Sequence, residues 1–221
     1  MIVMQADRSG DMPRKNRVWY PGAIYHVMNR GNRRAPIFQN EGDYYFFLKQ
    51  IEAAKNQYPF AVHSLCLMPN HFHIQLETEA EELGKIMKKI ATTYAMFYNS
   101  KYSLSGHLFG GRYKAPLIEN DAYFLEVSRY IHLNPVKAKM VKAPLDYEYS
   151  SYQLFMKDRE TIKRNHILKT MDGIVDTSRI LSFFGNDKDQ YRCFVEGAGE
   201  HDEQEKLIMN EMGEDELWLP S

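Results

Sequence analysis

Hydrophobic and polar positions alternate with two different periods along the chain, and the period changes from segment to segment. Three short apolar runs, each bounded by turn residues, predict β-strands at residues 23–30, 60–68 and 71–77. Three longer segments with apolar positions three and four apart predict helices at residues 41–58, 79–102 and 120–135. The glycine-rich stretch between the last two helices predicts an open loop with one short edge strand, at residues 113–119.

The order strand, helix, strand, strand, helix, strand predicts an α+β fold. We expect a ferredoxin-like antiparallel sheet with helices on one face, which leaves the other face free. Only short helical patterns follow, so a C-terminal helical appendage is expected. The predicted organisation is a polar N-terminal arm, a main domain, the helical appendage and an acidic tail, at residues 1–18, 19–145, 146–197 and 198–221.

Two histidines lie two positions apart in the stretch "LCLMPNHFHIQLE". Strand side chains alternate between faces, so His71 and His73 share the expected free face, whereas Phe72 and Ile74 point to the covered face. Two adjacent imidazoles suit one divalent metal ion. Taken alone, the pair is equally compatible with two half-exposed polar residues on a solvated face.

A second candidate element is "SRYIHLNP", where Tyr130 and Asn134 are spaced i, i+4 on the predicted helix. Residues at this spacing share one face of a helix. A phenol and a carboxamide could therefore present a nucleophile and a neutral oxygen ligand to the same point. The alternative is a core tyrosine in an amphipathic helix, with Asn134 as an ordinary residue before Pro135.

Charge is distributed unevenly along the 221 residues, although the net charge is only −1. Counting along the sequence, residues 1–142 carry a net charge of +7 and residues 196–221 a net charge of −8. A basic body could bind a polyanion, with an ordinary solvated surface as the alternative. No long apolar segment, signal-peptide pattern or cysteine pattern is present, so we expect a cytoplasmic protein with no membrane partner, which would be nucleoid-associated if the polyanion is DNA.

If the polyanion is a nucleic acid, basic and aromatic residues around the predicted loops are candidates for contacts with it. Phosphate contacts are expected from Arg30, Arg33, Arg34, Arg112, Lys114 and Lys137. Stacking on unpaired bases is considered for Tyr25, Phe109 and Tyr113, with core packing as the favoured alternative.

Several motifs in order resemble the single-tyrosine HUH transposases of the IS200-like superfamily, most of all the REP-associated tyrosine transposases. They are "YHVMNRGNRRAPIF", "LMPNHFHIQLE" and "GRYKAPLIENDAYFLEVSRYIHLNPVKAKMV", with a weaker echo in "YRCFVEGA". The resemblance implies a transposase that cuts and rejoins single-stranded DNA beside hairpins formed by REP-like repeats. It implies Tyr130 as the catalytic nucleophile, which forms a 5′-phosphotyrosine and leaves a 3′-hydroxyl. It also implies Mg²⁺ or Mn²⁺ bound by His71, His73 and Asn134.

Two other functions remain open from the sequence. One is a non-catalytic module that binds single-stranded nucleic acid on its sheet. The other is a zinc hydrolase that uses His71, His73 and a third ligand such as His63, His26 or His132. The resemblance also leaves the assembly open, because relatives work either as homodimers or as monomers.

Overall fold

Four antiparallel strands form one sheet, and the computed structural model describes residues 18–197 and Ile208 of the chain. The strands are β1 (Ile24–Arg30), β2 (Phe60–Met68), β3 (His71–Thr78) and β4 (Leu117–Ile118), in the spatial order β2-β3-β1-β4. The predicted α+β, ferredoxin-like fold is therefore confirmed. Strand β4 is short because it pairs with only the first two residues of β1.

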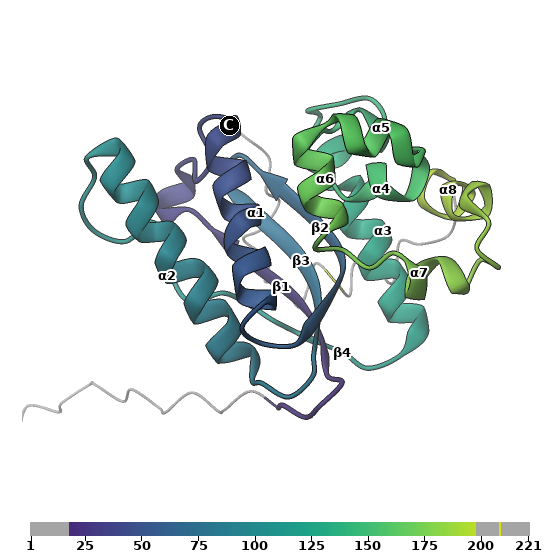
Figure 1. Cartoon of the computed structure of the whole chain (residues 1–221), viewed down its shortest axis with the longest axis horizontal. Coiled ribbons are helices and arrows are strands. Elements are labelled where there is room, and N and C mark those ends of the chain that lie inside the picture. Colours follow the sequence, from purple (N-terminus) through teal and green to yellow (C-terminus); the bar gives the residue numbers. More distant parts are fainter. Residues whose placement is uncertain (1–17, 198–207, 209–221) are drawn as a thin grey trace, which may run out of the picture.

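Helices α1 (Glu41–Lys55) and α2 (Leu83–Tyr102) pack together over one face of the sheet (Figure 1). The side chains of Phe72, Ile74 and Leu76 are fully buried beneath them, as the alternation predicts. Helix α2 begins later than predicted, at Leu83, because the residue before it, Glu82, has extended backbone angles. The acidic residues at 79–82 thus form the connection from β3 rather than a first helical turn.

Helix α3 (Asp121–Lys137) covers the opposite face of the sheet, so the prediction of a free face is wrong. Eleven of its residues are buried, which means that the helix has neighbours on more than one side. Figure 1 shows α1 and α2 on one side of the sheet and α3 on the other. Among the later helices, α8 contacts α3 and α6 contacts α1. His71 and His73 are consequently fully buried between β3 and α3.

Short helices follow α3, as the sequence predicts. Two 3₁₀ turns and five α-helices complete the described chain: η1 (Asn32–Arg34), η2 (Pro144–Asp146), α4 (Tyr152–Met156), α5 (Arg159–Arg164), α6 (His166–Asp172), α7 (Ser178–Ser182) and α8 (Lys188–Glu196). These helices contribute apolar side chains to the cores on both faces of the sheet. The proposed division into domains stays a prediction.

A β-bulge in β2 places two consecutive polar residues on the α3 side of the sheet. The register of β2 against β3 shifts between Val62 and Ser64. The His63 Nε2 atom lies 2.8 Å from a carboxylate oxygen of Glu77, and the Ser64 hydroxyl donates to the Gln75 side chain over 2.9 Å. The Gln75 amide in turn donates to the backbone carbonyl of Phe124 on α3, over 2.8 Å. This relay fixes the position of α3 above the sheet.

The predicted N-terminal arm and acidic tail lie outside the described residues, apart from Val18 and Ile208. Ile208 is 1% exposed and belongs to the core beneath α3. None of the helices in the described part of the chain has the length and apolar character needed to cross a membrane.

Candidate active site

Strand β3 and helix α3 bring the four predicted site residues together. His71 and His73 point from β3 toward α3, and the i, i+4 spacing of Tyr130 and Asn134 turns both side chains toward the sheet. The two histidines are fully buried, and Tyr130 and Asn134 are each 6% exposed. Two pairs of residues that are at least 57 positions apart in sequence therefore form one compact group.

The side-chain amide of Asn134 bridges the two histidines. Its Oδ1 atom lies 3.2 Å from His71 Nε2, and its Nδ2 atom lies 3.3 Å from His73 Nε2. Both imidazoles thus direct the same ring nitrogen, Nε2, toward the same amide group. This arrangement places two nitrogen atoms and one oxygen atom around a common point.

Asn70 determines which nitrogen of His71 carries the proton. The Asn70 Nδ2 group donates to the backbone carbonyl of Arg34 over 3.4 Å, so its Oδ1 atom faces His71 Nδ1 at 2.6 Å. An amide oxygen only accepts, so His71 Nδ1 carries the proton and donates. The lone pair of His71 Nε2 therefore faces Asn134 Oδ1, which is also an acceptor. Two acceptors that face each other suit a cation between them.

Burial keeps the imidazoles of this group neutral. It lowers the pKa of His71 and of His26 to about 3, and for His71 the positive charge of Arg30 adds to the lowering. Burial also holds the pKa of His73 well below its ordinary value, helped by His71 and His26. Neutral imidazole is the form that binds metal ions. The donor atoms present, two imidazole nitrogens and one amide oxygen, thus fit a divalent cation.

Tyr130 lies against the histidines through its ring. The ring centroid is 5.8 Å from that of His73 and 5.9 Å from that of His26, with edge-on geometry in both cases. The Lys137 Nζ atom lies over the same ring, 4.8 Å from the centroid. The structure places Lys137 one helical turn beyond Asn134 and over the ring of Tyr130. Its expected contact with DNA phosphate stays a prediction.

The histidines considered as a third zinc ligand have other partners. His63 contacts Glu77, and His132 lies 2.8 Å from the Tyr191 hydroxyl and 2.9 Å from the Ser151 hydroxyl. His26 Nε2 faces His73 Nδ1 rather than the Nε2 group. Across residues 18–197 and Ile208, no three His, Cys, Asp or Glu side chains are grouped to hold a metal ion. The contacts of His26, His63 and His132, none of which joins His71 Nε2 and His73 Nε2, do not favour a zinc hydrolase.

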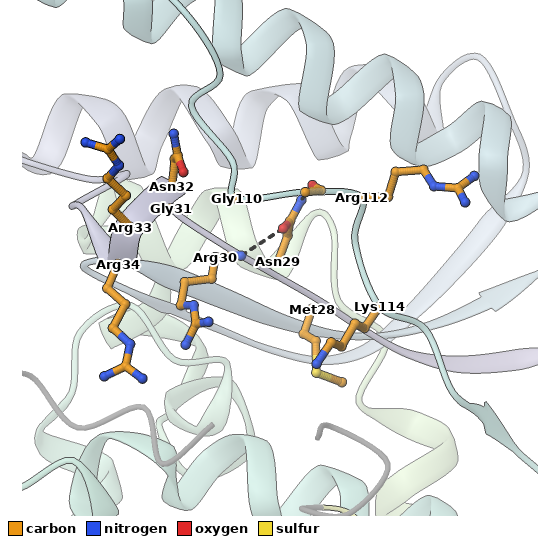
Figure 2. A pocket seen from close by; sticks show the side chains of 11 residues that line it. Met28, Asn29, Arg30, Gly31, Asn32, Arg33, Arg34, Gly110, Arg112 and Lys114 are labelled. Carbon is orange, nitrogen blue, oxygen red and sulfur yellow. Dashed lines mark hydrogen bonds between the residues drawn. The ribbon is translucent and has the colours of Figure 1, made fainter. Parts of the chain in front are cut away.

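A basic pocket opens beside the end of β1, with a volume of about 510 Å³. Figure 2 shows its side chains: Arg30 and Arg34 extend in one direction and Arg33 in the opposite one. No acidic residue is among those that line it, whereas five of the six predicted phosphate contacts are: Arg30, Arg33, Arg34, Arg112 and Lys114. The pocket thus collects positive charge from two segments that are far apart in sequence.

The turn that carries these arginines has an unusual backbone. Arg33 and Arg34 adopt left-handed angles, with φ of 54° and 63°, which non-glycine residues rarely do. At Gly31, an added Cβ atom would lie 2.0 Å from the carbonyl oxygen of Ala35, so only glycine fits. Strained backbone of this kind tends to persist where function requires it.

The aromatic residues considered for base stacking lie in the core or pack against it. Tyr25 is 1% exposed within the core, so it cannot stack on DNA bases without unfolding. Phe109 and Tyr113 are partly buried against the same core. The position of Asn70 beside the site was not predicted. His26 was considered only as a third zinc ligand, and the alternation of β1 places it on the same face as His73.

Comparison with known proteins identifies the group to which this geometry belongs. The family model described as "Transposase IS200 like" matches residues 20–134, just over half of the chain. No curated protein matches the chain.

Among solved structures, the chain is similar to a REP-associated tyrosine transposase bound to a REP hairpin. The two are 21% identical, with a TM-score of 0.55, over 65% of this chain and 84% of the other, which shows a common fold. A transposase structure from Deinococcus radiodurans R1 is 17% identical, with a TM-score of 0.39, over 54% of this chain and 95% of the other. The family match, which includes the histidine pair, Tyr130 and Asn134, shows that the chain belongs to the IS200-like transposases, enzymes that cut and rejoin DNA.

Proposed function

We propose that this transposase is a metal-dependent single-strand DNA endonuclease and strand transferase that works through a 5′-phosphotyrosine intermediate. The observation that carries the proposal is the group formed by His71, His73, Asn134 and Tyr130. Two neutral imidazoles and an amide oxygen converge on one point, and the phenol ring against His73 belongs to Tyr130, which the family resemblance names as the nucleophile.

The donor set supports Mg²⁺ or Mn²⁺ as the cofactor. His71 Nε2, His73 Nε2 and Asn134 Oδ1 would hold the ion, and the acceptor behind each histidine would orient its ring. A bound ion would supply positive charge to the phosphate oxygens, where negative charge develops during phosphoryl transfer.

The residues of the chain would carry out the covalent step. The Tyr130 oxygen attacks the phosphorus atom after losing its proton to solvent, and a new bond forms between this oxygen and phosphorus. The bond from phosphorus to the 3′ oxygen of the preceding nucleotide breaks, and that oxygen takes up a proton to become the 3′-hydroxyl. Rejoining is the same reaction in reverse, with a 3′-hydroxyl as the attacking group. No nucleotide cofactor is required, because the phosphotyrosine keeps the bond energy.

The basic pocket supports binding of the DNA backbone next to this site. Arg30 joins the two regions, since it lines the pocket and its charge also affects His71. The substrate proposed is single-stranded DNA that carries a hairpin or repeat, which agrees with the REP hairpin bound by the structural relative. The phosphate contacts would come from Arg30, Arg33, Arg34, Arg112 and Lys114.

A second pocket of about 600 Å³ lies beyond the basic one. Gly110, Gly111 and Arg112 line both pockets, together with Asn32. Backbone hydrogen bonds fix this shared wall, from Gly110 N–H to the carbonyl of Arg30 over 2.9 Å and from Asn32 N–H to the carbonyl of Leu108 over 2.8 Å. A strand whose phosphates lie in the basic pocket could continue over this wall.

The test mixes the full-length protein with end-labelled DNA hairpins, with and without Mn²⁺, and separates the products on a denaturing gel. The hairpins come from repeats that flank the gene. We expect a covalent protein–DNA band that requires Mn²⁺ and is absent for Tyr130→Phe, which removes one oxygen atom and leaves hairpin affinity unchanged. Tyr123→Phe is the matched control, because it removes a hydroxyl from the same helix, two turns earlier, and should still give the band.

A second pair of variants tests the metal site. His71→Ala should abolish the Mn²⁺-dependent band while the protein stays folded. His63→Ala should also stay folded and should still give the band. If wild-type protein binds the hairpins without any covalent band, the non-catalytic binding module becomes the better description. A band that persists in Tyr130→Phe would assign the nucleophile to another residue.

A further inference from the structure

A third buried histidine lies behind the proposed metal ligands. His26 on β1 is fully buried, and its Nε2 atom lies 2.9 Å from His73 Nδ1. The two rings are 5.1 Å apart and inclined by 32°. His26 is paired with Gln75 across the strands, so it reaches His73 diagonally. The resemblance assigns no role to this side chain.

One proton is shared in the contact between the two histidines, and its position determines what His73 can do. If His73 Nδ1 carries the proton, neutral His73 has a lone pair on Nε2, directed at the Asn134 amide. If His26 Nε2 carries it instead, neutral His73 must carry its own proton on Nε2. In that second state, His73 cannot bind a metal ion through Nε2.

The protonation of the other ring nitrogen of His26, Nδ1, changes with the position of this shared proton. His26 Nδ1 is buried, and no described residue lies within hydrogen-bonding distance of it. It bears a proton when His73 Nδ1 is the donor and a lone pair when His73 Nδ1 is the acceptor. The tautomers of His26 and His73 therefore change together, and binding of a cation at His73 Nε2 selects one of the two combined states.

We propose that His26 is a positioning residue that accepts the Nδ1 proton of His73 and so keeps His73 Nε2 available to the metal ion. His26 accepts the Nδ1 proton of His73 in the same way as the amide oxygen of Asn70 accepts the Nδ1 proton of His71, over 2.6 Å. Both ligands then have their tautomer fixed from behind by a buried or partly buried acceptor. This inference rests on the metal site of the proposed function, to which it adds a residue outside the ligand set.

The test measures the affinity of the full-length protein for Mn²⁺ by electron paramagnetic resonance of the unbound ion, without DNA. His26→Leu has a similar volume and no acceptor, and should weaken Mn²⁺ binding by about 10- to 100-fold. His26→Gln provides an acceptor oxygen and should recover most of that loss. His63→Leu is the matched control, because it removes another buried histidine from the same sheet face without contact to His73, and should bind Mn²⁺ like the wild type.

A second measurement reports the tautomers directly and does not depend on how well a variant folds. Nitrogen-15 NMR of wild-type protein saturated with Mg²⁺ should show the Nδ1–H tautomer for both His26 and His73. Finding His73 protonated on Nε2 would overturn the proposal, as would Mn²⁺ affinity that is equally weak in the Leu and Gln variants or unchanged in both. If the wild-type protein binds no Mn²⁺, the metal site of the proposed function fails first.

Discussion

Lys137 has a side-chain contact that the sequence did not indicate, and its expected contact with DNA phosphate stays a prediction. It lies seven residues after Tyr130 on α3, so both side chains project from the same face two turns apart. Its ammonium group lies over the ring of Tyr130, with Nζ 4.8 Å from the ring centroid. In the proposed reaction, a cation in this position would stabilise the negative charge of the attacking phenolate.

We predict that Lys137→Gln slows covalent adduct formation at pH 7 by at least about tenfold, since a unit charge about 5 Å away is worth about 3 kcal/mol at an effective dielectric constant of 20. The rate should recover as the pH is raised, because hydroxide then removes the phenol proton without help. Hairpin affinity should change by less than about threefold. Single-turnover rates across pH, at saturating DNA, provide the measurement.

Lys139→Gln is the matched control for this variant, because Lys139 is an exposed residue of the same segment. If Lys137 contacts phosphate instead, its removal should weaken DNA binding and leave the saturated rate unchanged. That result would support the contact expected from the sequence.

The histidine pair and the tyrosine–asparagine pair could be identified from the sequence because each has a fixed spacing on one element. His71 and His73 alternate on a strand, and Tyr130 and Asn134 share a helical face. The contacts of Asn70 and Lys137 could not be predicted, because they depend on how a turn and a helix end are placed in space. Tertiary placement, rather than local periodicity, determines those contacts.

At the scale of elements, the position of α3 is the feature that sequence reasoning missed. The helix was recognised, but the sheet face beneath it was expected to be free. A helix with buried residues on several sides needs partners on several sides, and α3 finds them in the sheet and in α8. His132 links these layers through the hydroxyls of Ser151 and Tyr191. The signal available in the sequence was that apolar residues occupy more than one side of α3, since Phe124 and Leu125 are consecutive.

The loop over Gly110 and Gly111 provides an element-scale prediction about DNA binding. A Cβ atom added at Gly111 would meet nothing within 4 Å, so a larger residue fits without disturbing the fold. Such a side chain would occupy the wall between the two pockets. Gly111→Leu should therefore weaken binding of a hairpin with a single-stranded extension by about tenfold, the loss expected when one stacked base is displaced. Fluorescence anisotropy with and without the extension measures this difference.

Gly84→Leu is the matched control, since its added Cβ atom also meets nothing within 4 Å and the residue lies in the first turn of α2, outside the set that lines either pocket. Both variants should have wild-type melting temperatures and should bind a hairpin without an extension equally well. Equal affinity of Gly111→Leu and wild-type protein for the extended hairpin would show that the strand does not cross this loop.

For the whole molecule, the C-terminal helices are integrated into the fold. Leu154 and Leu168 belong to the core beneath α1 and α2, whereas Tyr152, Phe155 and Tyr191 belong to the core beneath α3. Both cores thus contain side chains that come after residue 145.

We predict that a chain truncated after residue 145 does not reach the native state. Loss of one large aromatic core side chain costs about 3–5 kcal/mol, and several are lost together, against a typical total stability of about 5–15 kcal/mol. Circular dichroism and proton NMR of the truncated chain should show no cooperative unfolding and little dispersion. Deletion of residues 1–17 is the control, because it removes none of the described core side chains. A cooperatively folded 1–145 fragment would contradict this prediction.

The buried histidines give the whole molecule a predicted pH dependence. Burial lowers the pKa of five histidines: His26, His63, His71, His73 and His132. In the unfolded chain, each binds a proton near its ordinary pKa of about 6.5. As the pH falls below about 6.5, the unfolded state therefore binds more protons than the folded state, and the free energy of unfolding decreases.

Urea unfolding of metal-free protein between pH 7.5 and 5 should show that the free energy of unfolding decreases as the pH falls. The decrease should be up to about 1.4 kcal/mol per pH unit for each histidine. His63→Gln should reduce the pH dependence of the free energy of unfolding by about one proton. The variant should differ less from the wild type in its pH dependence above pH 7 than below it. A slope that is the same in both proteins would show that His63 takes up its proton in the folded state.

The anchoring of α3 has a consequence for the order of events on the DNA. Tyr130 lies on a helix that is packed against the sheet and α8, so in the proposed reaction a strand bound to it covalently would stay in one place. The other DNA end must then diffuse to the tyrosine, since the helix does not carry the attached strand elsewhere. Strand joining should therefore be first order in the concentration of the incoming 3′-hydroxyl strand, whereas cleavage of a bound strand is independent of it. The concentration of a separately added 3′-hydroxyl strand would then determine whether cleaved or joined DNA is the main product.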